Sequence, residues 1–199
     1  MERANLKHFE DTLRKENLPL FTSNDIVRIF GWSPTAVRFL LHRYSKKCII
    51  IRLKRGLYKL ASVPVPDFFI ANRLYEPSYI SMETALSFHG IIVETVYAIT
   101  SVSPRVGKTL SVLNKKFRYR KIKRSAYTGY TPIQRGTATA LIADPEKALA
   151  DYYYFVARGA CAPLDKDRLR IEKLNKEKIM RYARLFQDKN MNDVLKKLL

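Results

Sequence analysis

The sequence predicts an α+β fold in two domains, and three observations support this prediction. Apolar residues recur at helical spacing near both ends of the chain, whereas β-branched and basic-aromatic runs typical of strands occur between them. Two prolines lie within residues 63–66, and such a stiff, extended segment suits a joint between domains. The length of 199 residues is enough for two small cores. We therefore expect one domain at residues 1–62 and a second, mixed α/β domain with a helical C-terminal tail at residues 67–199.

Three helices are expected in the first domain. The first covers residues 1–17, where apolar side chains repeat at helical spacing. The second follows the polar run 22–24, which offers an N-cap. The third begins with Ser33 as its cap and Pro34 in the first position, where a missing N–H costs nothing, and it runs to about residue 45.

A basic hairpin is expected after these helices. The β-branched run 49–53 predicts one strand, residues 57–60 predict a second, and a turn containing Gly56 joins them. Two short helices joined by a glycine-containing turn and followed by such a hairpin have the element order of a winged helix-turn-helix. The first domain is therefore expected to read duplex DNA.

The charge balance of the chain favours a polyanionic partner. It has 37 Lys and Arg residues against 18 Asp and Glu residues, which gives a net charge of +19 and a pI near 10.0. Magnitudes of about 2 to 8 are enough to keep a small domain soluble, so solubility alone does not explain this excess. Lysine and arginine attract nucleic acid and release its condensed counterions on binding.

Candidate DNA contacts lie on the third helix and on the hairpin. At helical spacing, Thr35, Arg38 and His42 share the face opposite the apolar stripe. In a major groove, the guanidinium group of Arg38 can donate two hydrogen bonds to O6 and N7 of guanine. Arg55, at the tip of the hairpin, suits a minor groove, and the other basic residues suit phosphate. The expected contact residues are Ser33, Thr35, Arg38, His42, Arg43 and Lys46 on the helix, and Arg52, Lys54, Arg55 and Lys59 on the hairpin.

The second domain is expected to mix helices and strands. Ser81 can cap one of its helices, and Gly90 is placed to end that helix. Asp144 can cap another helix, with Pro145 in the first position. The expected helices cover residues 68–75, 82–89 and 144–157, with strands at 96–102 and 116–124 and further helical segments after residue 163.

Residues 115–124 form a second basic cluster, for which three interpretations are open. If the segment is a strand, Lys116, Arg118 and Arg120 project to one face as a possible second nucleic-acid patch. Such a patch can extend the DNA footprint or bind RNA. Alternatively, the strand is a sheet edge that lysines protect against aggregation.

Two further functional classes are alternatives to a DNA-binding regulator. An RNA-binding module would use Phe117, Tyr119 and Tyr127 as platforms on which bases stack. A DNA-processing nuclease would need carboxylates that converge on a metal ion, whereas a helix start explains the acidic residues within 144–146. We therefore expect a protein that is not an enzyme and that has no catalytic residues, no cofactor and no metal.

Composition also bears on localisation. The chain has no run of about 18 apolar residues, and its first 17 residues are too charged for a signal peptide. Its two cysteines lack the spacing of a disulfide framework or a zinc site. We expect a soluble, cytoplasmic protein that does not contact the membrane.

Several stretches resemble the AbiEi-type antitoxins of type IV toxin–antitoxin systems. They are residues 55–60 (RGLYKL), 79–90 (YISMETALSFHG) with 97–100 (YAIT), and 144–151 (DPEKALAD). The resemblance runs from about residue 8 to 155, and Val93 departs from the proline that is common in the family.

The resemblance implies a transcriptional repressor of its own operon and an antitoxin in phage abortive infection. Its N-terminal domain would bind inverted repeats in promoter DNA, and its C-terminal domain would supply the antitoxin activity. The implied partner is a nucleotidyltransferase-like toxin encoded by the partner gene. Direct contact with the toxin and a homo-oligomer on DNA are both left open by the resemblance.

Overall fold

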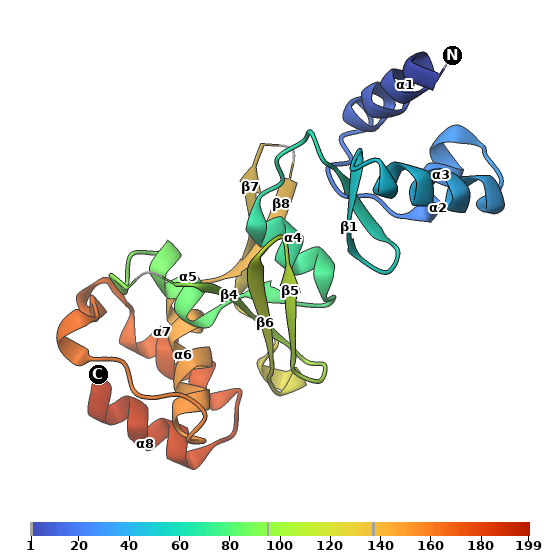
Figure 1. Cartoon of the computed structure of the whole chain (residues 1–199). Coiled ribbons are helices and arrows are strands. Elements are labelled where there is room, and N and C mark those ends of the chain that lie inside the picture. The colour runs from blue at the N-terminus through green and yellow to red at the C-terminus, as the bar shows by residue number, and fades with distance from the viewer. Residues whose placement is uncertain (1, 95, 137) are drawn as a thin grey trace. The chain divides into compact units, whose positions relative to one another are not determined.

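The structure is a computed structural model that describes residues 2–94, 96–136 and 138–199 (Figure 1). The chain folds into a mixture of helices and sheets. No helix within these described ranges is long and apolar enough to cross a membrane.

The chain divides into two compact units. Unit 1 comprises Met1–Ile70 and Gln134–Ala138, and unit 2 comprises Ala71–Ile133 and Thr139–Leu199. The proline-containing segment 63–66 therefore lies within unit 1, and the division falls a few residues after it.

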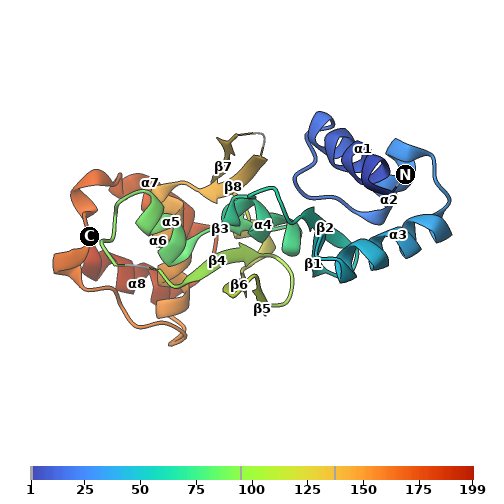
Figure 2. The ribbon, with the colours of Figure 1, turned by 45° about the horizontal axis from the view of Figure 1, so that its top comes forward.

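Unit 1 contains three helices and a β-hairpin, in the order that the sequence predicts (Figures 1 and 2). Its elements are α1 (Glu2–Lys15), α2 (Ser23–Phe30), α3 (Pro34–Lys46), β1 (Ile50–Lys54) and β2 (Leu57–Leu60). The strands pair antiparallel, with an irregular register between Arg52 and Lys54. Phe21 adds a short bridge to this hairpin, because the N–H groups of Phe21 and Tyr58 each donate to the other residue's carbonyl at 2.9 Å.

Local capping interactions explain where α2 and α3 begin and end. The Thr22 hydroxyl accepts from the N–H of Asp25, and the Asp25 carboxylate accepts from the N–H of Thr22 at 2.8 Å, which forms a capping box. Gly31 ends α2 in the left-handed conformation, with φ of 67°, where glycine is favoured. The Ser33 hydroxyl accepts from the N–H of Ala36 at 3.2 Å, so the predicted cap of α3 is confirmed.

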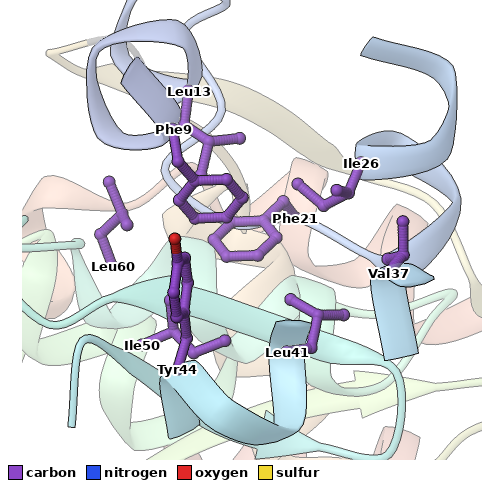
Figure 3. Close-up of a cluster of buried hydrophobic side chains, with 9 residues drawn as sticks. All are labelled: Phe9, Leu13, Phe21, Ile26, Val37, Leu41, Tyr44, Ile50 and Leu60. Carbon is purple, nitrogen blue, oxygen red and sulfur yellow. The ribbon is translucent and has the colours of Figure 1, made fainter. Parts of the chain in front are cut away.

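A cluster of buried apolar side chains joins the helices of unit 1 to its hairpin (Figure 3). The Phe9 ring packs edge-on against the rings of Tyr44 and Phe21, with centroid distances of 5.2 and 6.1 Å. The buried members of the cluster are Phe9, Leu13, Phe21, Ile26, Val37, Leu41, Tyr44, Ile50 and Leu60. Because this cluster takes one side of α3, the opposite side of that helix is left to solvent.

The rest of the chain contributes a six-stranded mixed sheet and five helices among the described residues (Figure 1). The strand order is β5-β6-β4-β3-β8-β7. In this sheet β4 pairs parallel with β6 and antiparallel with β3, and β3 pairs parallel with β8. The strands are β3 (Tyr79–Ile80), β4 (Ala98–Ser103), β5 (Lys108–Val112), β6 (Lys115–Lys121), β7 (Tyr130–Arg135) and β8 (Ala138–Ala143), and the helices are α4 (Asp67–Leu74), α5 (Met82–Phe88), α6 (Pro145–Val156), α7 (Lys176–Arg184) and α8 (Lys189–Leu198).

Helix α6 is the central helix of unit 2, where α5, α7 and α8 all pack against it. Its charged residues Lys147 and Asp151 are fully buried and form an ion pair one helical turn apart. The hydroxyls of Tyr79 and Ser81 also donate to the Asp151 carboxylate, at 3.0 and 2.6 Å. The buried carboxylate is therefore satisfied by three side-chain donors.

Two expected helix caps in unit 2 are not formed. The Ser81 hydroxyl donates to Asp151 and makes no capping hydrogen bond to α5. The Asp144 carboxylate accepts from the Tyr182 hydroxyl at 2.9 Å and pairs with Lys178 at 3.2 Å. Both residues precede a helix as expected, but partners distant in sequence take their side chains.

The interpretation of residues 115–124 as a sheet edge is wrong. β6 lies between β5 and β4, so both of its sides are hydrogen-bonded to other strands. The outer position belongs to β5, a strand that the sequence analysis does not identify.

Candidate nucleic-acid interface

A hollow of about 590 Å³ opens on unit 1 between α2, α3 and the hairpin. Three arginines line it, Arg38 from α3 and Arg52 and Arg55 from the hairpin, together with Thr35 and His42 from α3. Within the part of the chain that the structure describes, no Asp or Glu lines this hollow, so its charged side chains are all positive at high pH. We refer to it as the basic groove.

Helix α3 places three expected contact residues on its solvent side. Thr35, Arg38 and His42 are exposed, whereas the α3 side chains of the cluster in Figure 3 lie on the opposite side. The guanidinium carbon of Arg38 lies 5.5 Å from the centroid of the Phe39 ring, which is a cation–π distance. This contact orients Arg38 along the exposed side of the helix.

The hairpin brings the other two arginines to the groove. Gly56 has φ of 80° in the turn, a left-handed conformation that glycine adopts readily. Arg55 precedes it and is exposed at the tip of the hairpin. The Arg52 Nε donates to the backbone carbonyl of Lys54 at 3.4 Å, which holds its side chain along the strand.

Four other expected contact residues are exposed but do not line the groove. The Ser33 hydroxyl is engaged in the α3 cap. The Arg43 guanidinium carbon lies 5.7 Å from the centroid of the neighbouring Tyr44 ring. These four residues are Ser33, Arg43, Lys46 and Lys54.

Lys59 is the one expected contact residue that the structure buries. It is only 6% exposed, and its Nζ donates to the backbone carbonyl of Leu60 at 2.7 Å. Removal from water lowers the pKa of its ammonium group. The expected surface position of Lys59 is therefore wrong, because its charged end is hydrogen-bonded within the hairpin.

The groove also contains polar residues that the sequence analysis did not assign to it. Ser23 and Asn24 line it from the start of α2, and Ser45 and Tyr58 line it from α3 and β2. The polar run 22–24 was a usable signal, because one residue is enough for a cap. Thr22 forms that cap, so the other two side chains remain at the groove.

The possible second patch is not one exposed surface. Lys116 is exposed, whereas Arg118 and Arg120 are half-buried. The guanidinium carbon of Arg120 lies 5.0 Å from the centroid of the Phe155 ring, so this arginine packs against α6. Only part of the basic cluster is thus available to a large polyanion.

The aromatic residues proposed as RNA-stacking platforms belong to the interior of unit 2. Phe117 and Tyr119 are buried, and the Tyr119 hydroxyl donates to the carbonyl of Ala71 at 2.7 Å. Tyr127 is half-buried, with its ring centroid 5.3 Å from that of Tyr130. Burial of the Tyr119 phenol raises its pKa well above the usual value.

The acidic residues at the start of α6 are bound to a lysine. The Lys178 ammonium group lies 3.2 Å from a carboxylate oxygen of Asp144 and 2.9 Å from one of Glu146. The N–H of Asn175 also donates to Glu146, at 3.4 Å. These contacts connect the start of α6 to α7 and give both carboxylates a structural role.

Comparison with known protein families decides how this geometry is best interpreted. Residues 8–61 match a family model described as transcriptional regulator, AbiEi antitoxin. The resemblance noted from the sequence is therefore confirmed for this segment, which includes every residue that lines the basic groove. The AbiEi match supports a role in transcription regulation, as the antitoxin of a toxin–antitoxin system, and the family is one of regulators and antitoxins.

A solved structure with a similar arrangement of elements is the crystal structure of the RV2827C protein from Mycobacterium tuberculosis. It has a TM-score of 0.48 and 12% sequence identity, and the alignment covers 94% of this chain and 78% of that one. A comparison with curated protein sequences gives no match. The interpretation of the AbiEi segment therefore rests on the family match and on the groove itself.

Proposed function

We propose that this protein is a sequence-specific DNA-binding repressor that regulates its own operon as the antitoxin of a type IV toxin–antitoxin system. In this proposal, unit 1 is a winged helix-turn-helix, with α3 as the recognition helix and the β1–β2 hairpin as the wing. The observation that carries the proposal is the basic groove, where exposed arginines of α3 and of the hairpin line one hollow.

Helix α3 has the side chains needed to read bases in a major groove. Arg38 offers two donors for O6 and N7 of guanine, and Thr35 offers a hydroxyl and a methyl group for a base edge. His42, one turn further along, extends the same exposed row. A helix of this diameter fits the major groove of B-DNA.

The wing and the helix ends would contact the sugar-phosphate backbone. Arg55 at the wing tip suits an adjacent minor groove, and Arg52 and Lys54 suit phosphates. Ser23 and Asn24 lie at the start of α2, where helix N–H groups and the helix dipole favour an anion. Phosphate contacts at both α2 and the wing would fix the position of α3 along the duplex.

The proposed partners follow from the family match. The operator would contain inverted repeats bound by a homo-oligomer, and a nucleotidyltransferase-like toxin would be the cognate toxin. We assign the antitoxin activity to unit 2, in the cytoplasm. The alternatives have less support, because Phe117 and Tyr119 are buried and because Asp144 and Glu146 are held by Lys178.

In vitro selection tests this function directly. The purified full chain is used to enrich binding sites from a random duplex library, and the affinities for the selected duplex, a scrambled duplex and a structured RNA are then measured across a salt series. We expect the selected duplex to bind at least about 10³-fold tighter than the scrambled one, with affinities that fall as salt rises. Failure to enrich any sequence, or tighter binding to RNA than to the selected duplex, would overturn the proposal.

A further inference from the structure

One large apolar side chain of unit 1 projects into solvent from the proposed recognition helix. Phe39 on α3 is 63% exposed. Among the described residues of unit 1, it is the only large hydrophobic side chain that is exposed; the other such residues belong to unit 2. The core of unit 1 does not use this ring, because α3 packs its opposite side into the cluster of Figure 3.

Phe39 lies in the middle of the exposed side of α3. Positions three, four and seven residues apart fall on one side of a helix, and Phe39 is four residues after Thr35 and three before His42. The exposed residues on this side are Thr35, Arg38, Phe39, His42 and Lys46. The ring is therefore surrounded by side chains that are polar or positively charged.

The Arg38 guanidinium group restrains the Phe39 ring. Its carbon lies 5.5 Å from the ring centroid, where the cation is attracted by the π-face. A base-reading arginine and a phenyl ring are thus adjacent on one turn of α3. Any duplex that binds Arg38 in its major groove would meet Phe39 next to it.

We propose that Phe39 is a specificity-determining residue that recognises the C5-methyl group of a thymine beside the base pair read by Arg38. The major-groove edges of the four base pairs carry hydrogen-bond donors and acceptors, and the thymine methyl is the apolar group among them. Contact with this methyl removes apolar surface of both groups from water. The inference rests on the proposed function of unit 1 and adds to it the base that Phe39 selects.

Replacing thymine by uracil tests this recognition, because it removes only the C5-methyl group. Each thymine of the selected duplex is replaced in turn by deoxyuridine, and affinities are measured at one fixed salt concentration. For the wild-type chain we expect a loss of roughly fourfold at one thymine per half-site, the value for one buried methyl group. Phe39→Ala should lose this sensitivity, and Phe39→Leu, which keeps an apolar side chain, should retain part of it.

Two controls separate a base contact from other effects. Tyr97→Ala removes an aromatic side chain that is 92% exposed in unit 2, and it should keep the wild-type sensitivity to uracil. Thermal unfolding of Phe39→Ala should match that of the wild-type chain, because the ring is outside the core.

The outcomes distinguish this inference from the proposed function. A duplex that is selected and bound specifically, but whose affinity no deoxyuridine changes, would overturn the inference alone. The same holds if Phe39→Ala keeps the uracil sensitivity of the wild-type chain, or if it lowers unfolding stability and binding to all duplexes equally. If no duplex is selected, both the proposed function and the inference fail.

Discussion

The two units of this chain use charged side chains in opposite ways. In unit 1, Arg38, Arg52 and Arg55 are exposed around a hollow. In unit 2, Lys147 and Asp151 are each 0% exposed and paired with each other. Both sets lie within stretches that resemble the same antitoxin family. A charged signature is therefore not by itself a sign of a binding surface, because burial decides whether the charge meets a ligand or the core.

The buried pair of unit 2 has an energetic cost that its surroundings offset. Burial raises the pKa of Asp151 and lowers that of Lys147, because each charged form loses its water. The pairing of the two residues opposes both shifts, and the hydroxyls of Ser81 and Tyr79 add hydrogen bonds to the carboxylate. The cluster stays compatible with a core only while all its members are present.

The largest expected effect comes from breaking this cluster. Asp151→Asn leaves a buried lysine without its counter-charge, so we expect the free energy of unfolding to fall by about 3–5 kcal/mol. Chemical unfolding of the full chain followed by circular dichroism measures this change. Asp193→Asn, at an exposed position of α8, is the matched control and should change stability by less than about 0.5 kcal/mol.

A double variant distinguishes a charge effect from a packing effect. Lys147→Met combined with Asp151→Leu removes both charges and keeps apolar volume, so it should be more stable than Asp151→Asn. If Asp151→Asn were no worse than the Asp193 control, the two units would not differ in their use of charge as described above.

The next largest effect is expected on DNA affinity and tests the other side of the comparison. Arg38→Ala should weaken binding to the selected duplex by about 1–3 kcal/mol and relax specificity at one base pair. Arg28→Ala is a matched control, because Arg28 is 74% exposed on α2, pairs with Asp25 and does not line the groove. Equal losses from the two variants, measured by fluorescence anisotropy, would mean that net charge rather than the groove determines binding.

Features that depend on neighbours in sequence were predictable, as α2 and α3 illustrate. The turn at Gly31, the cap at Ser33 and the hairpin around Gly56 are set by backbone conformation and by hydrogen bonds within a few residues. The apolar spacing of α3 likewise predicted which side it buries and hence that Arg38 and Thr35 are exposed.

Features that depend on distant partners were not predictable from local patterns. Ser81 and Asp144 stand at helix starts, but their side chains are taken by residues 70 and 38 positions away. The burial of Lys59 and the interior position of β6 follow from packing and strand order in three dimensions. The exposed ring of Phe39 was missed for the opposite reason, because an aromatic residue at helical spacing is more often in a core.

The smallest expected effect concerns the lysine bridge between α6 and α7. Burial of Glu146 tends to raise its pKa, but the hydrogen bond from Lys178 and backbone N–H groups outweigh burial, so its pKa lies below the usual 4.5. The carboxylate therefore stabilises the folded state at neutral pH, where it is ionised. This contribution starts to be lost as the pH falls below about 4.5, and it is gone below the pKa of the folded state.

Glu146→Gln measures this contribution as a function of pH. The wild-type chain should be more stable than Glu146→Gln at pH 7, by less than the effect of Asp151→Asn, because Lys178 also keeps its contact with Asp144. The difference should shrink on acidification, since protonated Glu146 and glutamine are both neutral. Glu177→Gln, at an exposed position of α7, should show no such trend. A difference that persisted or grew at low pH would mean that Glu146 acts through packing rather than through its charge.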